Sequence, residues 1–287
     1  MSEPHFEYDI TGSIVLYKTN PTELEQAVQC FMDTSLRVKM VIVDNSPTEQ
    51  LRGLCSKLGT EYFYTGSNLG FGAAHNIALH NSAHSKYHVV LNPDVRFGNT
   101  VIEELVTFLE FNETVGLVMP RVVNPDGSPQ SLCKRLPTPF DIFARRLFPG
   151  PLKSIFQRQL AAFELRDMDM TKVLSVPYLS GCFMLLRRDA LRAVGFFDER
   201  FFMYFEDLDL SRRIHERFES VYYPFVTVIH RHERGSYRSA RLLFSGIKSA
   251  IQYFNKWGWM RDRQRTLVNS SVGPVYHLVS LPGRKTL

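Results

Sequence analysis

The fold is decided by two apolar runs, GSIVLY at residues 12–17 and VKMVIVD at residues 38–44, and by the segment between them. That segment opens with Pro21 and repeats apolar residues at the spacing of an amphipathic helix. Two further β-rich runs follow at residues 61–64 and 87–91. Strands that alternate with helices predict βαβ units, so we expect an α/β fold with a mostly parallel, Rossmann-like central sheet flanked by helices.

The composition is that of an ordinary globular enzyme. Of the 287 residues, 44% are apolar and 22% are charged, which is enough for a substantial core. A net charge of +5 and a pI of about 9.0 favour an anionic partner, such as a phosphate or an acidic membrane surface. The four cysteines form no C-x-x-C pair, which argues against a zinc knuckle or a disulfide framework. Because we find neither a signal-peptide pattern nor an apolar run of about 20 residues, we expect a cytoplasmic protein.

The second half of the chain is less regular than the first. A helical pattern at residues 100–112 and a strand at 115–119 precede an Asn-Pro-Asp-Gly turn at 124–127, which predicts a hairpin. Residues 134–172 mix Pro, Arg and Phe without a period and predict a long loop with short helices. A final amphipathic run, with interleaved basic residues, predicts a helix at 237–259.

We expect two parts in this chain. Residues 1–236 form the predicted catalytic domain, with a donor-binding half at about 9–120 and an acceptor and catalytic half at about 121–236. Residues 237–287 form a C-terminal amphipathic helical extension and a tail. We find no internal repeat and no low-complexity tract.

Polar side chains follow two of the predicted strands at their carboxyl ends, the edge where ligands collect in open α/β sheets. Asp44 is placed to accept a hydrogen bond from a pyrimidine base, although Asp44 or Ser46 capping the next helix is the alternative. Asp94 follows Asn92 and Pro93, and a carboxylate there can bind a hard divalent ion whose other ligands are diphosphate oxygens and water. Such a charge assists the departure of a nucleoside diphosphate, whereas an isolated Asn-Pro-Asp is more often only a turn.

A glycine-rich stretch, GSNLGFGAAHN, occupies residues 66–76. Its three glycines and small residues permit close backbone approach before a helix, so a diphosphate or a ribose fits there. A purely structural turn requires the same residues and is the alternative interpretation.

The densest constellation of acids lies at residues 197–213, where five carboxylates stand among aromatic residues. If Glu206 opens a helix, Asp207 lies on its first turn and faces the crevice, while Asp209 and Arg213 are spaced to pair. Burial raises the pKa of a carboxyl group and a nearby cation lowers it, and a general base needs a setting between these limits. We therefore predict that Asp207 is the base. Acids placed at a helix N-terminus only to match the helix dipole are the alternative.

Two more segments are candidates for ligand contacts. Ser180 and Gly181 precede an apolar strand and are placed to offer backbone N–H groups to an acceptor, although packing explains them equally well. A polar cluster, HRHERGS at residues 230–236, follows another strand. We expect His230 to complete a metal shell and Arg231 to contact phosphate, with His232 as the alternative imidazole.

The ordered set of motifs resembles glycosyltransferase family 2, and especially its bacterial rhamnosyltransferase branch. The similarity covers roughly residues 10–255, and the order and spacing are more specific than any single motif. The residues that carry it are Ser13-Ile14-Val15, Val43-Asp44-Asn45-Ser46, Asn68-Leu69-Gly70-Phe71-Gly72, Leu91-Asn92-Pro93-Asp94, Ser180-Gly181 and Tyr204-Phe205-Glu206-Asp207-Leu208-Asp209-Leu210.

The resemblance implies a GT-A fold, an inverting single displacement and a divalent cation, Mg or Mn. Catalysis is assigned to Asp207 with Glu206. The acceptor contacts are assigned to Ser180, Gly181, Tyr204 and Glu206. The metal ligands are assigned to Asp94, Asn92 and His230. The donor contacts are assigned to Tyr17, Asp44, Asn68, Gly70, Gly72, Asn76, Asn92, Asp94 and Arg231.

One residue departs from the family pattern. Asn92 stands at the first position of the family's Asp-x-Asp motif, so the metal site has one negative charge fewer, although Asn still offers a carbonyl oxygen. The branch's usual donor is dTDP-β-L-rhamnose, and its usual acceptor is a lipid-linked saccharide or a growing polysaccharide such as O-antigen or capsule. A UDP- or GDP-sugar donor and a non-catalytic nucleotide-sugar or glycan-binding module are the alternatives. A sugar nucleotidyltransferase would need a glycine-rich basic loop near the N-terminus, which residues 13–20 do not offer.

The basic and aromatic segment at residues 237–265 predicts contact with an anionic inner leaflet, as expected for a peripheral protein on the cytoplasmic face of the inner membrane. A helix that packs on the core or on a second subunit of a homodimer is the alternative. No pattern supports nucleic-acid binding beyond mild basicity.

Overall fold

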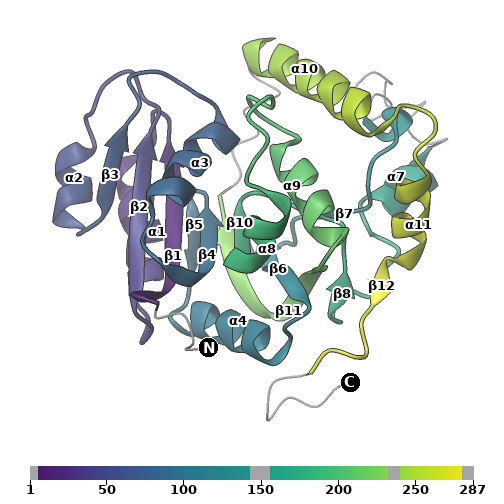
Figure 1. Ribbon diagram of the computed structural model, residues 1–287, viewed down its shortest axis with the longest axis horizontal. Coiled ribbons are helices and arrows are strands. Elements are labelled where there is room, and N and C mark those ends of the chain that lie inside the picture. Colours follow the sequence, from purple (N-terminus) through teal and green to yellow (C-terminus); the bar gives the residue numbers. More distant parts are fainter. Residues whose placement is uncertain (1–5, 143–155, 232–239, 280–287) are drawn as a thin grey trace.

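The computed structural model describes residues 6–142, 156–231 and 240–279 and shows a mixed α/β architecture around one large sheet (Figure 1). The first half alternates strands and helices, as predicted. Its elements are β1 (Tyr8–Leu16), α1 (Pro21–Met32), β2 (Val38–Asp44), α2 (Arg52–Lys57), β3 (Glu61–Tyr64), α3 (Phe71–Asn81), β4 (Ser85–Leu91), β5 (Val95–Phe97), α4 (Thr100–Phe111) and β6 (Val115–Val123).

The second half combines strands as short as two residues with the longest strand and the longest helix among the described residues. The helices that flank this half are α7 (Gln157–Phe163), α8 (Arg188–Val194), α9 (Glu206–His215), α10 (Ala240–Trp257) and α11 (Arg263–Ser271). Its strands are β7 (Cys133–Lys134), β8 (Leu174–Ser175), β9 (Tyr178–Leu179), β10 (Phe183–Arg187), β11 (Glu219–His230) and β12 (Gly273–Pro274).

The main sheet has the strand order β12-β8-β11-β6-β10-β4-β1-β2-β3, with β5 paired to β11. Strands β4, β1, β2 and β3 run parallel, as the βαβ pattern predicts. Strand β10 is inserted antiparallel between β4 and β6, and β8 and β12 also pair antiparallel with their neighbours, so the sheet as a whole is mixed. The α/β fold class is confirmed, and the division into a donor-binding half and an acceptor half stays a prediction.

Side-chain alternation along β2 explains why helices cover both faces of the sheet. Met40 and Ile42 belong to the large core cluster that also buries the apolar stripe of α1. Val41 and Val43 point to the opposite face and pack with Ala74 and Ala78 of α3. A strand that is apolar on both faces is expected at the centre of an α/β sheet, because both faces are covered.

The C-terminal helices pack over the segment that leads into α9. Phe201 and Leu208 form a separate buried cluster with Tyr253 and Phe254 of α10, and α10 crosses the upper edge of the molecule in Figure 1. Within the described residues, no helix has the length and apolar content required to cross a bilayer. The division between catalytic domain and extension at residue 237 stays a prediction.

Candidate active site

The register of the sheet brings the predicted site residues to one edge. In the parallel pair β1 and β2, Leu16 lies opposite Asp44, and Ile14 of β1 lies opposite Leu91 of β4. These strands therefore end together, with Asp44 at the end of β2 and Asn92 directly after β4. Tyr17, just beyond β1, is 43% exposed at the same edge. The convergence that the sequence predicts at the carboxyl ends of the strands is present.

Asp44 is fully buried, and its carboxylate already has two internal partners. Its Oδ1 accepts from the Ser46 backbone N at 2.8 Å, and its Oδ2 accepts from the Tyr62 hydroxyl at 2.7 Å. Helix α2 begins at Arg52 after Leu51 without any side-chain cap, so the alternative that Asp44 or Ser46 caps this helix is wrong. Asp44 thus organises the loop after β2, and its contact with a donor base stays a prediction.

The glycine-rich loop is fastened on one side to the loop after β2. Asn68 Oδ1 accepts from the Gly70 backbone N at 2.9 Å, and Asn45 Nδ2 donates to the Gly70 carbonyl at 3.0 Å. Gly70 has φ 93°, a left-handed conformation that favours glycine. A Cβ atom at Gly70 would lie 2.1 Å from the Phe202 carbonyl oxygen, which accepts from the Phe71 backbone N at 3.1 Å. The loop therefore requires glycine because it abuts the segment that precedes Asp207.

Gly72 and Asn76 both contact Phe197, through packing and hydrogen bonds that the sequence did not predict. Gly72 is buried, and a Cβ atom there would lie 2.9 Å from Phe197 Cβ. Asn76 is 4% exposed and exchanges both backbone hydrogen bonds with Phe197, donating to its carbonyl at 2.9 Å and accepting from its N–H at 3.0 Å. Its Nδ2 also donates to Glu199 Oε1 at 2.9 Å. The Asn76 amide thus fastens the 197–199 segment to α3, and its contact with a donor stays a prediction.

Asp94, Asn92 and His230 converge, as predicted for a cation site. His230 Nε2 lies 3.4 Å from Asp94 Oδ1 and 3.2 Å from Asn92 Nδ2. His230 is 4% exposed, and Asp94 is partly buried. No three His, Cys, Asp or Glu side chains gather into a metal-binding group anywhere in the described ranges, so this site has one carboxylate and one imidazole.

A neighbouring glutamine fixes the tautomer of His230. Gln130 Nε2 donates to the His230 carbonyl at 2.7 Å and to Asn124 Oδ1 at 2.8 Å. Its Oε1 therefore faces His230 Nδ1 at 2.9 Å and accepts a hydrogen bond from the Nδ1–H group. In the neutral ring, Nε2 then carries the lone pair, with Asn92 Nδ2 at 3.2 Å and Asp94 Oδ1 at 3.4 Å. An imidazole oriented by such a partner, beside a carboxylate, fits a divalent ion that takes its remaining ligands from diphosphate and water.

Asp207 lies on the first turn of α9, as predicted, and two backbone amides fix its carboxylate. Oδ2 accepts from the Gly181 N at 2.9 Å, and Oδ1 accepts from the Leu208 N at 2.8 Å. Burial raises the pKa of Asp207, while these two amides and the positive charge of Lys134 oppose the rise. The carboxylate is only partly buried, so it combines an oriented geometry with access from the crevice.

Glu206 has a different environment from its neighbour. It is 5% exposed, and its Oε2 is buried without a hydrogen-bond partner. Burial, together with the charge of Asp207, raises the pKa of Glu206 well above its ordinary value. Its Cβ lies 3.4 Å from where a Cβ at Gly72 would stand, so Glu206 packs against α3. Glu206 therefore lies deeper in the protein than Asp207, and its contact with an acceptor stays a prediction.

The dipeptide Gly181-Cys182 joins the two acidic centres. Because β10 runs antiparallel to β4, the residues just before β10 meet the residues just after β4. The Gly181 N–H donates to Asp207, and the Cys182 carbonyl accepts from the Asn92 N–H at 2.9 Å. Burial raises the pKa of the Cys182 thiol to about 12, and the charges of both Asp94 and Asp207 add to the rise. Asp94 and Asp207 thus flank the same short segment.

The remaining predicted residues lie around this crevice. Ser180 is partly buried beside Gly181. Tyr204 adopts the left-handed conformation at φ 66°, next to Phe205 at φ 71°, and strain of this kind is common at functional sites. The Arg231 backbone N donates to the Asp94 carbonyl at 3.3 Å, and its guanidinium contacts Glu23 at 3.2 Å. His232 lies outside the described residues.

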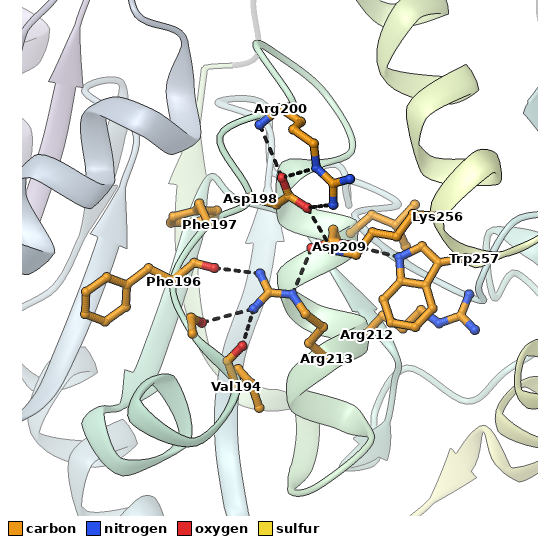
Figure 2. Close-up of polar contacts among 12 residues, drawn as sticks. Val194, Phe196, Phe197, Asp198, Arg200, Asp209, Arg212, Arg213, Lys256 and Trp257 are labelled. Atoms are coloured by element: carbon orange, nitrogen blue, oxygen red, sulfur yellow. Dashed lines mark hydrogen bonds and ion pairs between the residues drawn. The ribbon is translucent and has the colours of Figure 1, made fainter.

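Helix α9 is held from behind by a network of charges (Figure 2). Asp209 is fully buried, with Arg213 Nε at 2.8 Å, Lys256 Nζ at 2.7 Å and Trp257 Nε1 at 2.8 Å. Arg213 also donates to the carbonyls of Val194 at 2.7 Å and Phe196 at 2.6 Å, as Figure 2 shows. The i,i+4 pairing predicted from sequence is confirmed, and it belongs to a larger structure that ties α9 to α10.

Two residues near the site were missed by the sequence reasoning. Gln130 orients His230, and it arrives there because the turn at residues 124–127 folds the chain back, with Val123 bridging Pro129. The predicted hairpin was the available signal. Lys134 lowers the pKa of Asp207 from β7, a two-residue strand that pairs with β9, and its sequence carries no recognisable signal.

Comparisons with known proteins agree with this geometry. The model of the family described as "Glycosyl transferase family 2" matches residues 14–195. N-acetylglucosaminyl-diphospho-decaprenol L-rhamnosyltransferase of Mycobacterium tuberculosis is 29% identical over 231 residues, which cover 75% of this chain and 74% of that protein. Rhamnosyltransferase WbbL of Escherichia coli K12 is 24% identical over 253 residues, which cover 82% and 89%.

Solved structures show the same fold at low sequence identity. GalNAc-T7 with UDP, GalNAc and Mn2+ superposes with a TM-score of 0.60 at 15% identity, covering 79% of this chain and only 43% of that one. A mannosyltransferase from Pyrobaculum calidifontis, in complex with GDP-Man and Mn2+, superposes with a TM-score of 0.56 at 15% identity, covering 87% and 68%. The chain belongs to glycosyltransferase family 2 and has a GT-A fold.

Proposed function

We propose that this protein is an inverting, metal-dependent glycosyltransferase that moves L-rhamnose from dTDP-β-L-rhamnose to a lipid-linked or growing cell-surface polysaccharide. The observation that carries the proposal is that Asp207 and Asn92 are hydrogen-bonded to adjacent residues, Asp207 to Gly181 and Asn92 to Cys182. It sets a candidate base beside a candidate site for a diphosphate-bound cation. The sugar is supported by two relatives whose names specify rhamnosyl transfer.

Asp207 is the proposed general base. The acceptor hydroxyl oxygen attacks the anomeric carbon, its proton passes to the Asp207 carboxylate, and the bond to the diphosphate oxygen breaks on the opposite face. The electron pair of that bond leaves with the nucleoside diphosphate. The Gly181 and Leu208 amides hold the carboxylate in one orientation, so that it meets the acceptor without first reorganising.

The cation site is proposed at Asp94, with Asn92 and His230. A bound Mg or Mn ion would neutralise the charge that grows on the departing diphosphate. Gln130 keeps the Nε2 lone pair of His230 directed at this site, and Asp94 supplies the negative charge. The Mn2+ and nucleotide sugars named in two structural neighbours support a cation here.

A donor panel tests the proposed activity. The protein is incubated with dTDP-rhamnose, UDP-sugars or GDP-sugars, with Mg or Mn, and released nucleoside diphosphate is measured with and without a saccharide acceptor. We expect acceptor-dependent release with dTDP-rhamnose. Preference for a UDP- or GDP-sugar would replace the donor while leaving the reaction class intact. Binding without any release from any donor would favour a non-catalytic module.

Asp94→Ala tests the cation site. We expect metal-dependent donor affinity to fall about tenfold or more, because Asp94 is the only carboxylate that the described residues place at this site. Donor titration by calorimetry with and without Mn measures the effect, and Asp189→Ala, at an exposed position of α8 where the carboxylate pairs with Arg192, is the control. Equal donor affinities for the variant and the unmodified protein in the presence of metal would remove Asp94 from the site.

A further inference from the structure

Helix α10 has two faces that meet different surroundings. Its inner face packs on the catalytic segment. Ser249 Oγ donates to the Met203 carbonyl at 2.9 Å, and a Cβ atom at Gly246 would lie 3.3 Å from the Tyr204 ring. The Tyr253 ring lies 5.5 Å from the Phe205 ring. The three residues that lead into Glu206 and Asp207 therefore rest directly on α10.

The outer face of α10 is apolar and uncovered. Phe244 is 70% exposed, Ile251 is 42% exposed and Ile247 is 38% exposed. At 3.6 residues per turn these side chains fall within one sector of about 100°, which also holds Lys248. Met260, just after the helix, is 86% exposed. Clusters of exposed apolar side chains on one helix face are typical of an interaction surface.

The exposed charged side chains of the described C-terminal segment, residues 240–279, have one sign. From residue 240 to residue 279 the sequence has a single acid, Asp262, which is buried and paired with Arg212. Lys248, Arg261 and Arg263 are all exposed. A cationic and apolar helix face without exposed acids complements an anionic lipid surface, where apolar side chains insert between the headgroups and basic ones pair with them.

We propose that the outer face of α10, formed by Phe244, Ile247, Lys248 and Ile251, docks on an anionic bilayer. Docking places the bilayer on one side of α10 and the 203–207 segment on the other, so Asp207 is carried close to the membrane surface. This inference rests on the proposed function in one respect, since a lipid-linked acceptor is what makes the location useful. The docking itself requires only the helix and the lipid.

Flotation with vesicles tests the docking. The full chain is mixed with vesicles of phosphatidylcholine alone or of phosphatidylcholine with phosphatidylglycerol, and bound protein is measured. We expect binding only to the anionic vesicles. The double variant F244Q/I251Q should bind at least about tenfold more weakly, because two inserted side chains are lost. Lys248→Gln should bind about fivefold more weakly, because one charge near the surface is lost.

Two controls make the result specific. Phe111→Gln removes a side chain that is 51% exposed on α4, the helix at the lower edge of Figure 1, and should leave binding unchanged. Asp207→Asn should float like the unmodified protein, since docking does not depend on catalysis. Circular dichroism and thermal unfolding check that F244Q/I251Q is folded, and transfer to a water-soluble acceptor should persist in it.

The outcomes separate the docking from the activity. Flotation without transfer from any donor would leave the docking surface intact and overturn the proposed function. Transfer without flotation, or equal flotation of F244Q/I251Q and the unmodified protein, would overturn the docking. A dimer in light scattering that F244Q/I251Q dissociates, together with no lipid binding, would assign this face to a second copy of the chain and would also overturn it.

Discussion

Two buried polar networks support the candidate site from different sides, and they are built from different chemistry. Behind α9, Arg212 is paired with Asp262 at 2.7 and 2.8 Å, and both side chains are less than 5% exposed. Beneath α3, the Ser13 hydroxyl lies 2.8 Å from both His75 Nδ1 and His88 Nε2. The proposed catalytic side thus rests on buried ion pairs, and the proposed donor side rests mainly on hydrogen bonds between uncharged side chains.

In the hydrogen-bonded network beneath α3, which group donates each hydrogen bond follows from the bond that Ser85 makes to a backbone carbonyl. The Ser85 hydroxyl donates to the Tyr87 carbonyl at 2.8 Å, so Thr11 donates to Ser85 at 3.0 Å. Thr11 also accepts from Arg188 at 3.3 Å. With its only hydrogen used, Thr11 must accept from His88 Nδ1 at 2.8 Å. The His88 Nδ1 atom therefore carries the proton.

The same logic continues to α3. Burial lowers the pKa of His75 to about 3 and holds that of His88 well below its ordinary value, so both rings are neutral at neutral pH. His88 Nε2 then accepts from Ser13, and Ser13 accepts from His75 Nδ1. His75 Nε2 is left as a buried acceptor without a hydrogen-bond partner, and the centroids of the His75 and Phe71 rings lie 4.3 Å apart.

This difference between the two networks predicts how much stability is lost when one partner is removed from each. Removing one partner of a buried ion pair leaves a whole charge without compensation, whereas removing a hydroxyl leaves only unpaired dipoles. Full charges also tie α10 and α11 to α9 over long sequence separations. We therefore expect the catalytic side to be the more fragile of the two.

Asp262→Ala should produce the largest loss of stability. It leaves the Arg212 guanidinium buried without its bidentate partner and removes the N-cap of α11, where Asp262 accepts from the Arg265 N at 2.9 Å. We expect the free energy of unfolding to fall by about 4 kcal/mol. Urea denaturation measures it. Asp189→Ala, which breaks an exposed pair with Arg192, should cost less than about 1 kcal/mol. Equal losses in both variants would break the comparison.

Ser13→Ala should have a smaller effect that does not depend on pH. Two buried imidazole nitrogens lose their partner, for a cost of about 2 kcal/mol. A histidine whose pKa is lowered by folding stabilises the protein above its unfolded pKa, and this contribution is lost as the pH falls. Both rings stay buried in the variant, so its deficit should be constant from pH 6 to pH 8. A deficit that changes steeply in that range would mean that one ring is charged.

Glu206→Gln should have the smallest effect, and of opposite sign. A carboxyl whose pKa is raised by folding contributes stability when protonated, and this contribution is lost as the pH rises through the folded pKa. The pKa of Glu206 is raised well above its ordinary value by burial and by Asp207. Glutamine is neutral throughout, so the variant should melt slightly higher than the unmodified protein at pH 8, with the gain shrinking towards pH 5. A destabilised variant at pH 8 would show that the ionised carboxylate has a partner.

The parallel half of the fold follows directly from local patterns. Residues 38–44 and 61–64 form the predicted strands with the predicted limits, because their apolar runs are short and bounded by turn residues. Strand β10 is the apolar strand predicted after Ser180 and Gly181, but its antiparallel insertion between β4 and β6 was not predicted. Strand order depends on contacts between distant segments, and no local pattern encodes it.

The candidate site shows the same limit. The Asp209–Arg213 pair could be predicted because i,i+4 spacing on a helix fixes which side chains meet. Asn76 was assigned to the donor because it closes a glycine-rich motif, yet its partner is Phe197, 121 residues away. The roles of Gln130 and of the Ser13 hydrogen bonds were not predicted for the same reason, because their partners, His230 and His75, come close only in the folded sheet.

The central claim is that Asp207 is the base, and the Asp207→Asn variant tests it most directly. Asparagine keeps the shape of the side chain and one acceptor oxygen for the Gly181 or Leu208 amide, but it cannot take a proton. We expect transfer to fall by about a thousandfold while donor affinity stays nearly unchanged. In the unmodified protein, kcat should fall as the pH drops through a pKa above the ordinary aspartate value, because only the ionised carboxylate acts. Near-normal transfer by Asp207→Asn, measured as acceptor-dependent release of nucleoside diphosphate, would contradict the assignment.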